Sequence, residues 1–182
     1  MHRPTNPKRP SPIALHSLSA RATRGLLRLG AIGIPCAVGR SGLACLKREG
    51  DRKTPRGTLT PLSVRYRDDR VRRPLSALPT LPTRTRHGWC DDPSDRNYNR
   101  PITLPYPASS ETMTRTDNLY DIVVVLDYNY RRRVRYRGSA IFLHLATRGY
   151  TPTEGCIAVK EPHMRLLLKA LGRHGCIFTR CR

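Results

Sequence analysis

A histidine and a cysteine stand close together in the sequence, in surroundings that suit nucleophilic chemistry. His144 lies inside the apolar run Ile-Phe-Leu-His-Leu, where a polar residue costs free energy unless it is hydrogen-bonded or faces a functional cleft. Cys156 follows twelve residues later in Thr-Glu-Gly-Cys-Ile. A cysteine is a nucleophile only as the thiolate, and a neighbouring histidine generates the thiolate by accepting the proton. We therefore take Cys156 as the candidate nucleophile and His144 as its base.

The segment between these two residues decides whether they meet. It is a polar loop, and a hairpin-like return through it brings Cys156 beside His144. Gly155 removes side-chain bulk next to the sulfur and permits unusual backbone angles, so the N–H groups around Cys156 are candidates for an oxyanion hole. The spacing alone leaves an equal alternative, in which a core histidine and a buried cysteine never meet.

Three stretches of the chain resemble motifs of the L,D-transpeptidase family, whose catalytic domain is of the YkuD type. They are similar to its T-P-x-G-x-F element, its histidine strand and its [S/T]-x-G-C-[I/V] nucleophile motif, and they lie at Thr54–Leu59, Ile141–His144 and Thr153–Ile157. Two further segments, Trp89–Pro93 (W-C-D-D-P) and Tyr98–Arg100 (Y-N-R), resemble a divergent, proteobacterial-looking branch. The resemblance covers roughly residues 25–180.

The resemblance implies a mechanism and a partner. Cys156 attacks the carbonyl of the diamino acid at the third position of a peptidoglycan stem peptide, D-alanine leaves, and a thioester acyl-enzyme forms. An amine acceptor then makes the enzyme a transpeptidase, whereas water makes it an L,D-carboxypeptidase. His144 activates the thiol and later returns the proton. The same resemblance implies no cofactor and a place in the cell envelope or periplasm.

The chain departs from the family's usual Ser-His-Gly-Cys-[I/V]-Arg at two positions. Glu154 replaces the histidine and Ala158 replaces the arginine. A carboxylate beside the thiol disfavours the thiolate unless it is paired or points away. Because the missing arginine normally shapes the pocket, we expect Arg100 or Arg148 to substitute for it.

An irregular insertion at about 67–120 is expected to form the substrate wall, with Trp89 and Tyr98 as contacts. For Trp89 an ordinary core anchor is an equal alternative. The candidate substrate-binding residues are thus Arg100, Trp89, Tyr98, Arg148 and Glu154.

Short apolar runs predict a mainly β, sandwich- or barrel-like fold of the L,D-transpeptidase type. Strands are expected at about 25–38 (two strands), 59–66, 121–127, 139–145 and 176–179. Helical spacing of apolar residues predicts one helix in the C-terminal half, from Glu161 to Leu171. We expect a basic, flexible segment at 1–22 and a single catalytic domain at 23–182.

The formal net charge of +21 leaves a second hypothesis open. Such a charge favours a polyanionic partner, and the run Arg131–Arg133 is its densest cluster. A non-enzymatic protein that binds nucleic acid or another polyanion is therefore the alternative. No nucleic-acid motif accompanies the run, and a solvated hairpin tip explains it equally well.

Several further classes find no support in the sequence. No apolar run approaches the ~18–20 residues of a transmembrane segment, and the N-terminus has no recognisable signal peptide, so a cytoplasmic start or another export route stays open. His174, Cys176 and Cys181 cluster without the spacing of a structural zinc site, so we expect no metal site. The sequence does not indicate an oligomeric state.

Overall fold

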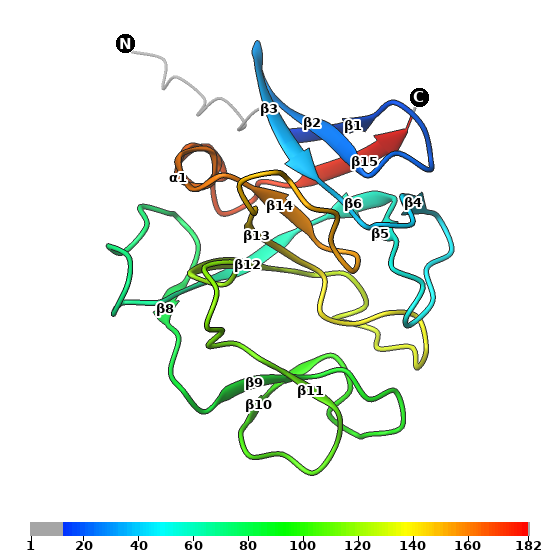
Figure 1. The fold of residues 1–182 in the computed structure, drawn as a ribbon, viewed down its shortest axis with the longest axis vertical. Helices are drawn as coiled ribbons and strands as arrows, with labels where there is room; N and C mark the ends of the chain where they lie inside the picture. The colour runs from blue at the N-terminus through cyan, green and yellow to red at the C-terminus, as the bar shows by residue number, and fades with distance from the viewer. Residues whose placement is uncertain (1–12, 182) are drawn as a thin grey trace, which may run out of the picture.

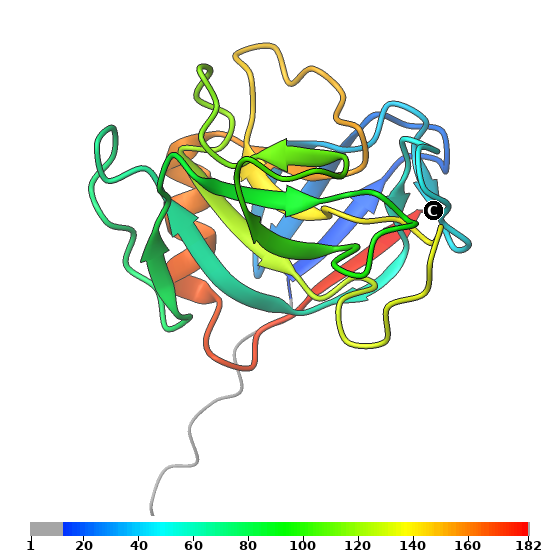
Figure 2. The ribbon, with the colours of Figure 1, turned by 90° about the horizontal axis from the view of Figure 1, so that it is seen from below.

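A ten-stranded mixed sheet forms the frame of the protein in the computed structural model, which describes residues 13–181 (Figure 1). In sheet order the strands are β6 (Gly57–Leu59), β15 (Ile177–Cys181), β1 (Ile13–Ser17), β2 (Arg24–Leu29), β3 (Ile32–Ala37), β14 (Ile157–Val159), β13 (Phe142–Leu145), β12 (Ile122–Leu126), β7 (Pro61–Tyr66) and β8 (Thr80–Pro82). Only Thr60 separates β6 from β7, yet the two strands stand near opposite edges of this order. The sheet must therefore curl round until its edges approach each other, as Figure 2 shows. The prediction of a mainly β, barrel-like fold is confirmed.

α1 (Glu161–Ala170) is the only helix among residues 13–181, and it packs against the curled sheet (Figure 1). It begins with Glu161 and Pro162 in the first turn, where an acidic side chain complements the helix dipole and proline lacks only an N–H that would be unpaired anyway. Its buried side chains, Met164, Leu167 and Leu168, join the aliphatic core inside the curl. The predicted helix is confirmed to within one residue at its end.

The central strands β12 and β13 are buried on both faces, which explains their continuous apolar sequences. One face packs into the aliphatic core, with Val124 and Leu143 among its members. The other face belongs to a second, aromatic cluster, whose residues are Trp89, Met113, Tyr120, Val123, Val125, Ala140, Phe142 and Cys156.

The segment 67–120, predicted to be irregular, carries β8 and a separate three-stranded sheet. That sheet has the order β10 (Arg100–Thr103), β9 (His87–Cys90), β11 (Ser110–Thr112). Trp89 on β9 and Met113 beside β11 pack in the aromatic cluster. Strands of three or four residues that contain Gly88 and Pro101 show no usable alternation, so the sequence pattern did not predict this sheet.

The N-terminal part of the described chain also differs from the prediction of a flexible segment at 1–22. β1 pairs in parallel with β15 and antiparallel with β2, and it buries Ile13 and Leu15 completely. Two apolar side chains at alternate positions are enough to hold β1 in the sheet, because both edges of this strand pair with neighbouring strands. Residues 1–12 lie outside the described part of the chain. A two-stranded parallel pair, β4 (Leu43–Ala44) with β5 (Thr54–Pro55), completes the fold.

Candidate active site

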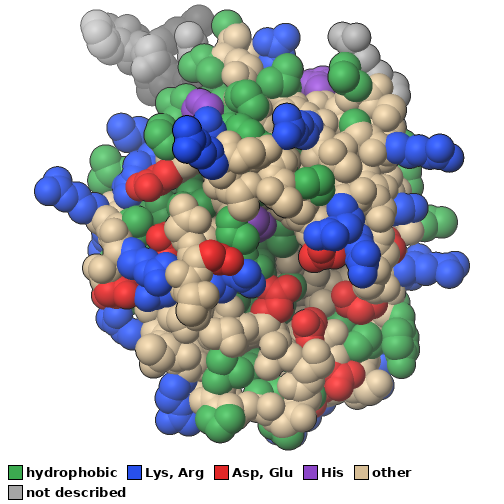
Figure 3. Space-filling view, in the orientation of Figure 1, with side chains coloured by type: hydrophobic (Ala, Val, Ile, Leu, Met, Phe, Trp, Pro, Cys, Tyr) green, Lys and Arg blue, Asp and Glu red, His purple; other side chains and the backbone are tan. Residues whose placement is uncertain are grey.

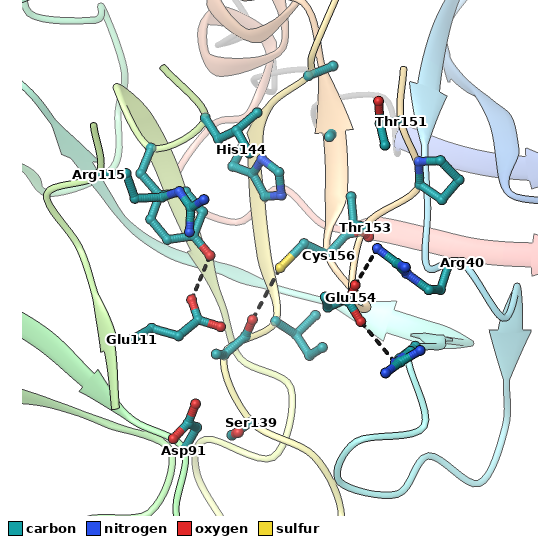
Figure 4. A pocket seen from close by; sticks show the side chains of 18 of the residues that line it. Arg40, Asp91, Glu111, Arg115, Ser139, His144, Thr151, Thr153, Glu154 and Cys156 are labelled. Atoms are coloured by element: carbon teal, nitrogen blue, oxygen red, sulfur yellow. Dashed lines mark hydrogen bonds and ion pairs between the residues drawn. The ribbon is translucent and has the colours of Figure 1, made fainter. Parts of the chain in front are cut away.

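His144 and Cys156 line one cavity of about 560 Å³ between the large sheet and the three-stranded sheet. Figure 3 shows this cavity as a hollow in the face of the molecule, with acidic side chains gathered around it. Figure 4 shows the His144 imidazole directed toward the Cys156 sulfur. The candidate nucleophile and the candidate base therefore lie together in one cavity. The alternative, in which a core histidine and a buried cysteine never meet, does not describe this structure.

Two neighbouring strands position the pair. β13 and β14 lie parallel, with His144 opposite Ala158, and Cys156 immediately precedes β14. The predicted hairpin-like return is wrong, because parallel strands require a crossover connection. The loop instead crosses the end of β3, where the Thr153 N–H donates to the Val38 carbonyl at 3.0 Å.

The Cys156 side chain is held as a buried thiol. Its Sγ donates to the Ala140 carbonyl at 3.2 Å and accepts the Phe142 N–H at 3.3 Å. Burial raises the pKa of the Cys156 thiol to about 12, and the negative charge of Glu111 adds to the shift. The resting state is therefore a neutral thiol, which requires a base before it can attack.

The His144 ring has the tautomer that such a base needs. Its Nδ1–H donates to the Leu145 carbonyl at 2.8 Å, since a carbonyl can only accept, and this leaves Nε2 unprotonated in the neutral ring. Tyr120 packs edge-on against the imidazole with ring centroids 5.4 Å apart. Burial lowers the pKa of His144 to about 4, so the ring is neutral at pH 7.

The backbone around the thiol depends on Gly155 and two threonines. Gly155 has φ +139°, and a Cβ there would lie 3.0 Å from the Lys53 carbonyl oxygen, so glycine is required. The Cys156 carbonyl accepts hydroxyl hydrogen bonds from Thr153 at 2.6 Å and Thr54 at 3.3 Å. The T-P-x-G element thus reaches the nucleophile through Thr54, a contact that the sequence did not predict.

Only part of the expected oxyanion hole is available. The Gly155 N–H already donates to the Thr153 hydroxyl at 3.2 Å. This leaves the Cys156 N–H as the donor that an oxyanion hole next to the sulfur would use.

The family model of the L,D-transpeptidase catalytic domain, of the YkuD type, matches residues 11–177. The chain belongs to the L,D-transpeptidase family. No curated protein and no solved structure was found to match it. The mainly β, curled sheet is consistent with this catalytic domain.

Glu154, one of the two departures from the family motif, does not act on the thiol in this L,D-transpeptidase domain. Its carboxylate lies 2.5 Å from the Arg40 guanidinium and 3.3 Å from that of Arg52, at the rim of the cavity (Figure 4). The carboxylate is thus paired with two arginines, which offsets the effect that its charge would otherwise have on the thiol.

Trp89 and Tyr98, expected as substrate contacts, are buried in the domain and do not line the cavity. The Trp89 Nε1–H donates to Asn99 Oδ1 at 3.0 Å, and its ring packs edge-on against Phe142 at 5.1 Å. The Tyr98 hydroxyl donates to the Glu49 carboxylate. Their geometry is that of core anchors behind the cavity wall.

The two arginines expected to replace the missing motif arginine are not at the cavity either. Arg100 stacks over the Tyr130 ring at 4.0 Å, and Arg148 is exposed on the loop between β13 and β14. Arg115 lines the cavity instead, with its guanidinium 2.7 Å from the Asp117 carboxylate. Ala158 itself is buried on β14.

Three acidic residues on the cavity wall were not predicted. Glu49, Asp91 and Glu111 line it, and within residues 13–181 none of them forms an ion pair. Burial raises the pKa of Glu111, which accepts the Tyr120 hydroxyl at 2.6 Å. The Asp91 Oδ1 atom is buried, with no hydrogen-bond partner in the described chain. The W-C-D-D-P motif contains Asp91 and was the available signal for it.

Among residues 13–181, no group of three or more His, Cys, Asp and Glu side chains converges as metal ligands would. No helix in this part of the protein is both long and apolar enough to cross a membrane.

Proposed function

We propose that the protein is a cysteine-dependent L,D-transpeptidase that acts on peptidoglycan stem peptides in the cell envelope. The observation that carries the proposal is the shared cavity of Cys156 and His144, with the His144 tautomer fixed by the Leu145 carbonyl. In this family the histidine needs no catalytic carboxylate, and here a backbone carbonyl holds its ring.

In the proposed acylation step, proton transfer accompanies attack. The thiol pKa is raised and the imidazole pKa is lowered, so a thiolate–imidazolium pair is disfavoured before substrate binds. The Cys156 proton moves to His144 Nε2 as the sulfur bonds to the carbonyl carbon of the diamino acid at position three. The imidazolium then gives this proton to the departing D-alanine nitrogen, leaving a thioester.

The acidic wall favours an amine over water as the acceptor. A diamino acid carries a side-chain ammonium, and the carboxylates of Glu49, Asp91 and Glu111 attract such a cation into the cavity. The bound ammonium first releases one proton to solvent and becomes a neutral amine. As this amine attacks the thioester carbonyl, His144 takes its second proton and passes it to the departing Cys156 thiolate, so that a peptide bond and a free thiol are left. Water in place of the amine gives L,D-carboxypeptidase activity, the second candidate function.

The same wall argues against a polyanion as the occupant of this cavity, despite the charge of +21. Arg40 and Arg52 are paired with Glu154, Lys47 with Asp51 and Arg115 with Asp117. The net basic charge therefore lies mainly elsewhere on the surface. The exposed run Arg131–Arg133 is part of it, and its Arg133 side chain donates to the Arg96 carbonyl at 2.8 Å.

The test is product analysis with tetrapeptide-stem muropeptides. Wild type is expected to release D-alanine and to form crosslinked dimers, both followed by mass spectrometry, and Cys156→Ala to do neither. Cys45→Ala, which removes an exposed cysteine away from the cavity, is the matched control and keeps both products. Release of D-alanine without dimers supports the carboxypeptidase. Absence of release over a range of pH contradicts both enzymatic functions.

A further inference from the structure

A second cavity, of about 240 Å³, lies between the three-stranded sheet and the strands β7 and β12. No residue lines both this cavity and the catalytic one. We name it the Arg65 cavity; its lining includes Arg65, Thr83, His87, Trp89, Met113 and Val125. The volume corresponds to about eight waters at ~30 Å³ each, which is room for a small organic molecule.

Two polar side chains of the Arg65 cavity lack the partners that buried polar groups normally have. Thr83 is only 4% exposed, and its hydroxyl has no hydrogen-bond partner in the described chain. Arg65 is half-buried on β7, and its guanidinium forms no ion pair with any residue of 13–181. The Arg65 guanidinium is therefore available to a ligand, and a ligand oxygen that reaches the Thr83 hydroxyl would supply the partner that this buried group lacks.

His87 adds a third donor. Its Nδ1 accepts the Arg84 N–H at 3.1 Å, so the neutral ring carries its proton on Nε2. Burial, followed by the charges of Arg65 and Arg84, lowers the pKa of His87 and keeps the ring neutral at pH 7. A guanidinium, a hydroxyl and an imidazole N–H together form a set of donors that matches an anionic oxygen group.

Apart from Gly88 and the exposed Thr103, the rest of the lining is apolar, and it is free of carboxylates. Trp89, Met113 and Val125 supply one wall, and Pro101 and Ile102 of β10 supply another. No aspartate or glutamate lines the cavity, in contrast to the catalytic one. A ligand that satisfies this lining combines one negative group with a compact apolar body.

We propose that the Arg65 cavity binds a small monocarboxylate with a branched apolar body, whose carboxylate pairs with Arg65 and accepts the Thr83 hydroxyl. The guanidinium offers parallel N–H donors to the two carboxylate oxygens. The apolar body packs against the Trp89 ring. This site is separate from the proposed transpeptidase site and does not depend on it.

Fluorescence is a direct measurement, because Trp89 is the only tryptophan in the chain and lines the cavity. Isovalerate is expected to shift the Trp89 emission saturably, and the neutral isostere isovaleramide to bind about tenfold more weakly or not at all. Equal responses to the acid and the amide, or no saturable response, would overturn the proposal.

Three variants locate the binding. Arg65→Gln is expected to weaken isovalerate binding about tenfold or more, since it removes the charge. Arg132→Gln, an exposed arginine outside both cavities, is the matched control and leaves binding unchanged. Thr83→Val weakens binding severalfold without lowering Tm, because the buried hydroxyl it removes has no partner to lose.

The Thr83→Val result keeps the test valid if Arg65→Gln fails to fold. Unchanged isovalerate binding in Thr83→Val would contradict the proposal, as would equal effects of Arg65→Gln and Arg132→Gln. Cys156→Ala is expected to bind isovalerate as wild type does. The binding proposal and the transpeptidase proposal can therefore be disproved independently of each other. N-acetyl-valine in place of isovalerate distinguishes a peptide C-terminus from a free acid as the source of the carboxylate.

Discussion

The two faces of the strands β12, β13 and β14 differ in what they contribute to the protein. The core face packs only aliphatic side chains inside the curled sheet: Val124, Leu143, Leu145, Ile157 and Val159. The site face meets the aromatic cluster and the catalytic cavity: Val123, Val125, Phe142, His144 and Cys156. Because side chains alternate along a strand, neighbouring residues such as Leu143 and His144 serve opposite purposes.

Stability and chemistry are therefore separable between the two faces of the same strands. None of the core-face side chains of these strands is ionisable, whereas the site face buries a thiol and an imidazole and shifts the pKa of both. Substitutions on the site face should therefore lower activity more than stability. Substitutions on the core face should do the reverse.

The largest expected effect on the site face comes from His144→Gln. We expect D-alanine release to fall by about 10²–10⁴-fold, because in the proposed mechanism the variant lacks the base that accepts the Cys156 proton. The far-ultraviolet circular dichroism spectrum should stay that of wild type. Retention of more than a tenth of the activity would show that the site face does not depend on His144.

Leu143→Ala tests the core face at the adjacent position. Leu143 is fully buried, so the truncation should lower the free energy of unfolding by about 2–5 kcal/mol. Chemical denaturation measures this loss. Activity per folded molecule should be preserved at low temperature, and a specific loss of D-alanine release without destabilisation would break the comparison.

The pH dependence of stability gives a separate measurement on the site face. The difference in this dependence between wild type and His144→Gln reports on the His144 side chain alone. The folded-state pKa of His144 is about 4, against 6.5 as its ordinary value. Between these values the unfolded chain binds the proton and the folded chain does not. Stability is therefore lost as pH falls from about 6.5 to 4, by about 3 kcal/mol in total.

His144→Gln should lack this part of the acid destabilisation. Denaturant midpoints measured across pH 4–7 for both proteins give the difference. Parallel curves for the two proteins would contradict burial of a neutral imidazole on the site face.

The smallest effect is expected at the rim, for Glu154→Gln. Its ion pairs with Arg40 and Arg52 are exposed, so the loss of stability should be below about 1 kcal/mol. D-alanine release should change little, because the carboxylate is paired away from the thiol. A large rise in activity in Glu154→Gln would mean that this carboxylate restrains Cys156.

The sequence predicted the frame and singled out His144 and Cys156 as the candidate reactive pair, because both have strong local signals. The apolar run of β12 and the helical spacing of α1 each fix an element, and the residues beside His144 and Cys156 resemble a family motif. The parallel pairing of β13 with β14 has no local signal, since it depends on where the crossover loop packs. The hairpin prediction failed for that reason.

The cavity wall was less predictable than the reactive pair. Glu49, Asp91 and Glu111 come from three segments far apart in sequence, and none has a periodic neighbourhood. Arg100 and Arg148 were chosen by residue type alone, whereas Arg115 reaches the cavity through the turn after β11. Tertiary packing, which sequence periodicity does not encode, decides which charges line the cavity.

The intact mass of the protein during turnover shows directly whether Cys156 forms a thioester with the substrate. Incubation with a tetrapeptide-stem muropeptide should produce an adduct whose mass is that of the substrate minus D-alanine. Fragmentation should place this thioester on Cys156, and Cys156→Ala should form none. Turnover without an adduct that depends on Cys156, or an adduct on another cysteine such as Cys45 or Cys90, would contradict the account.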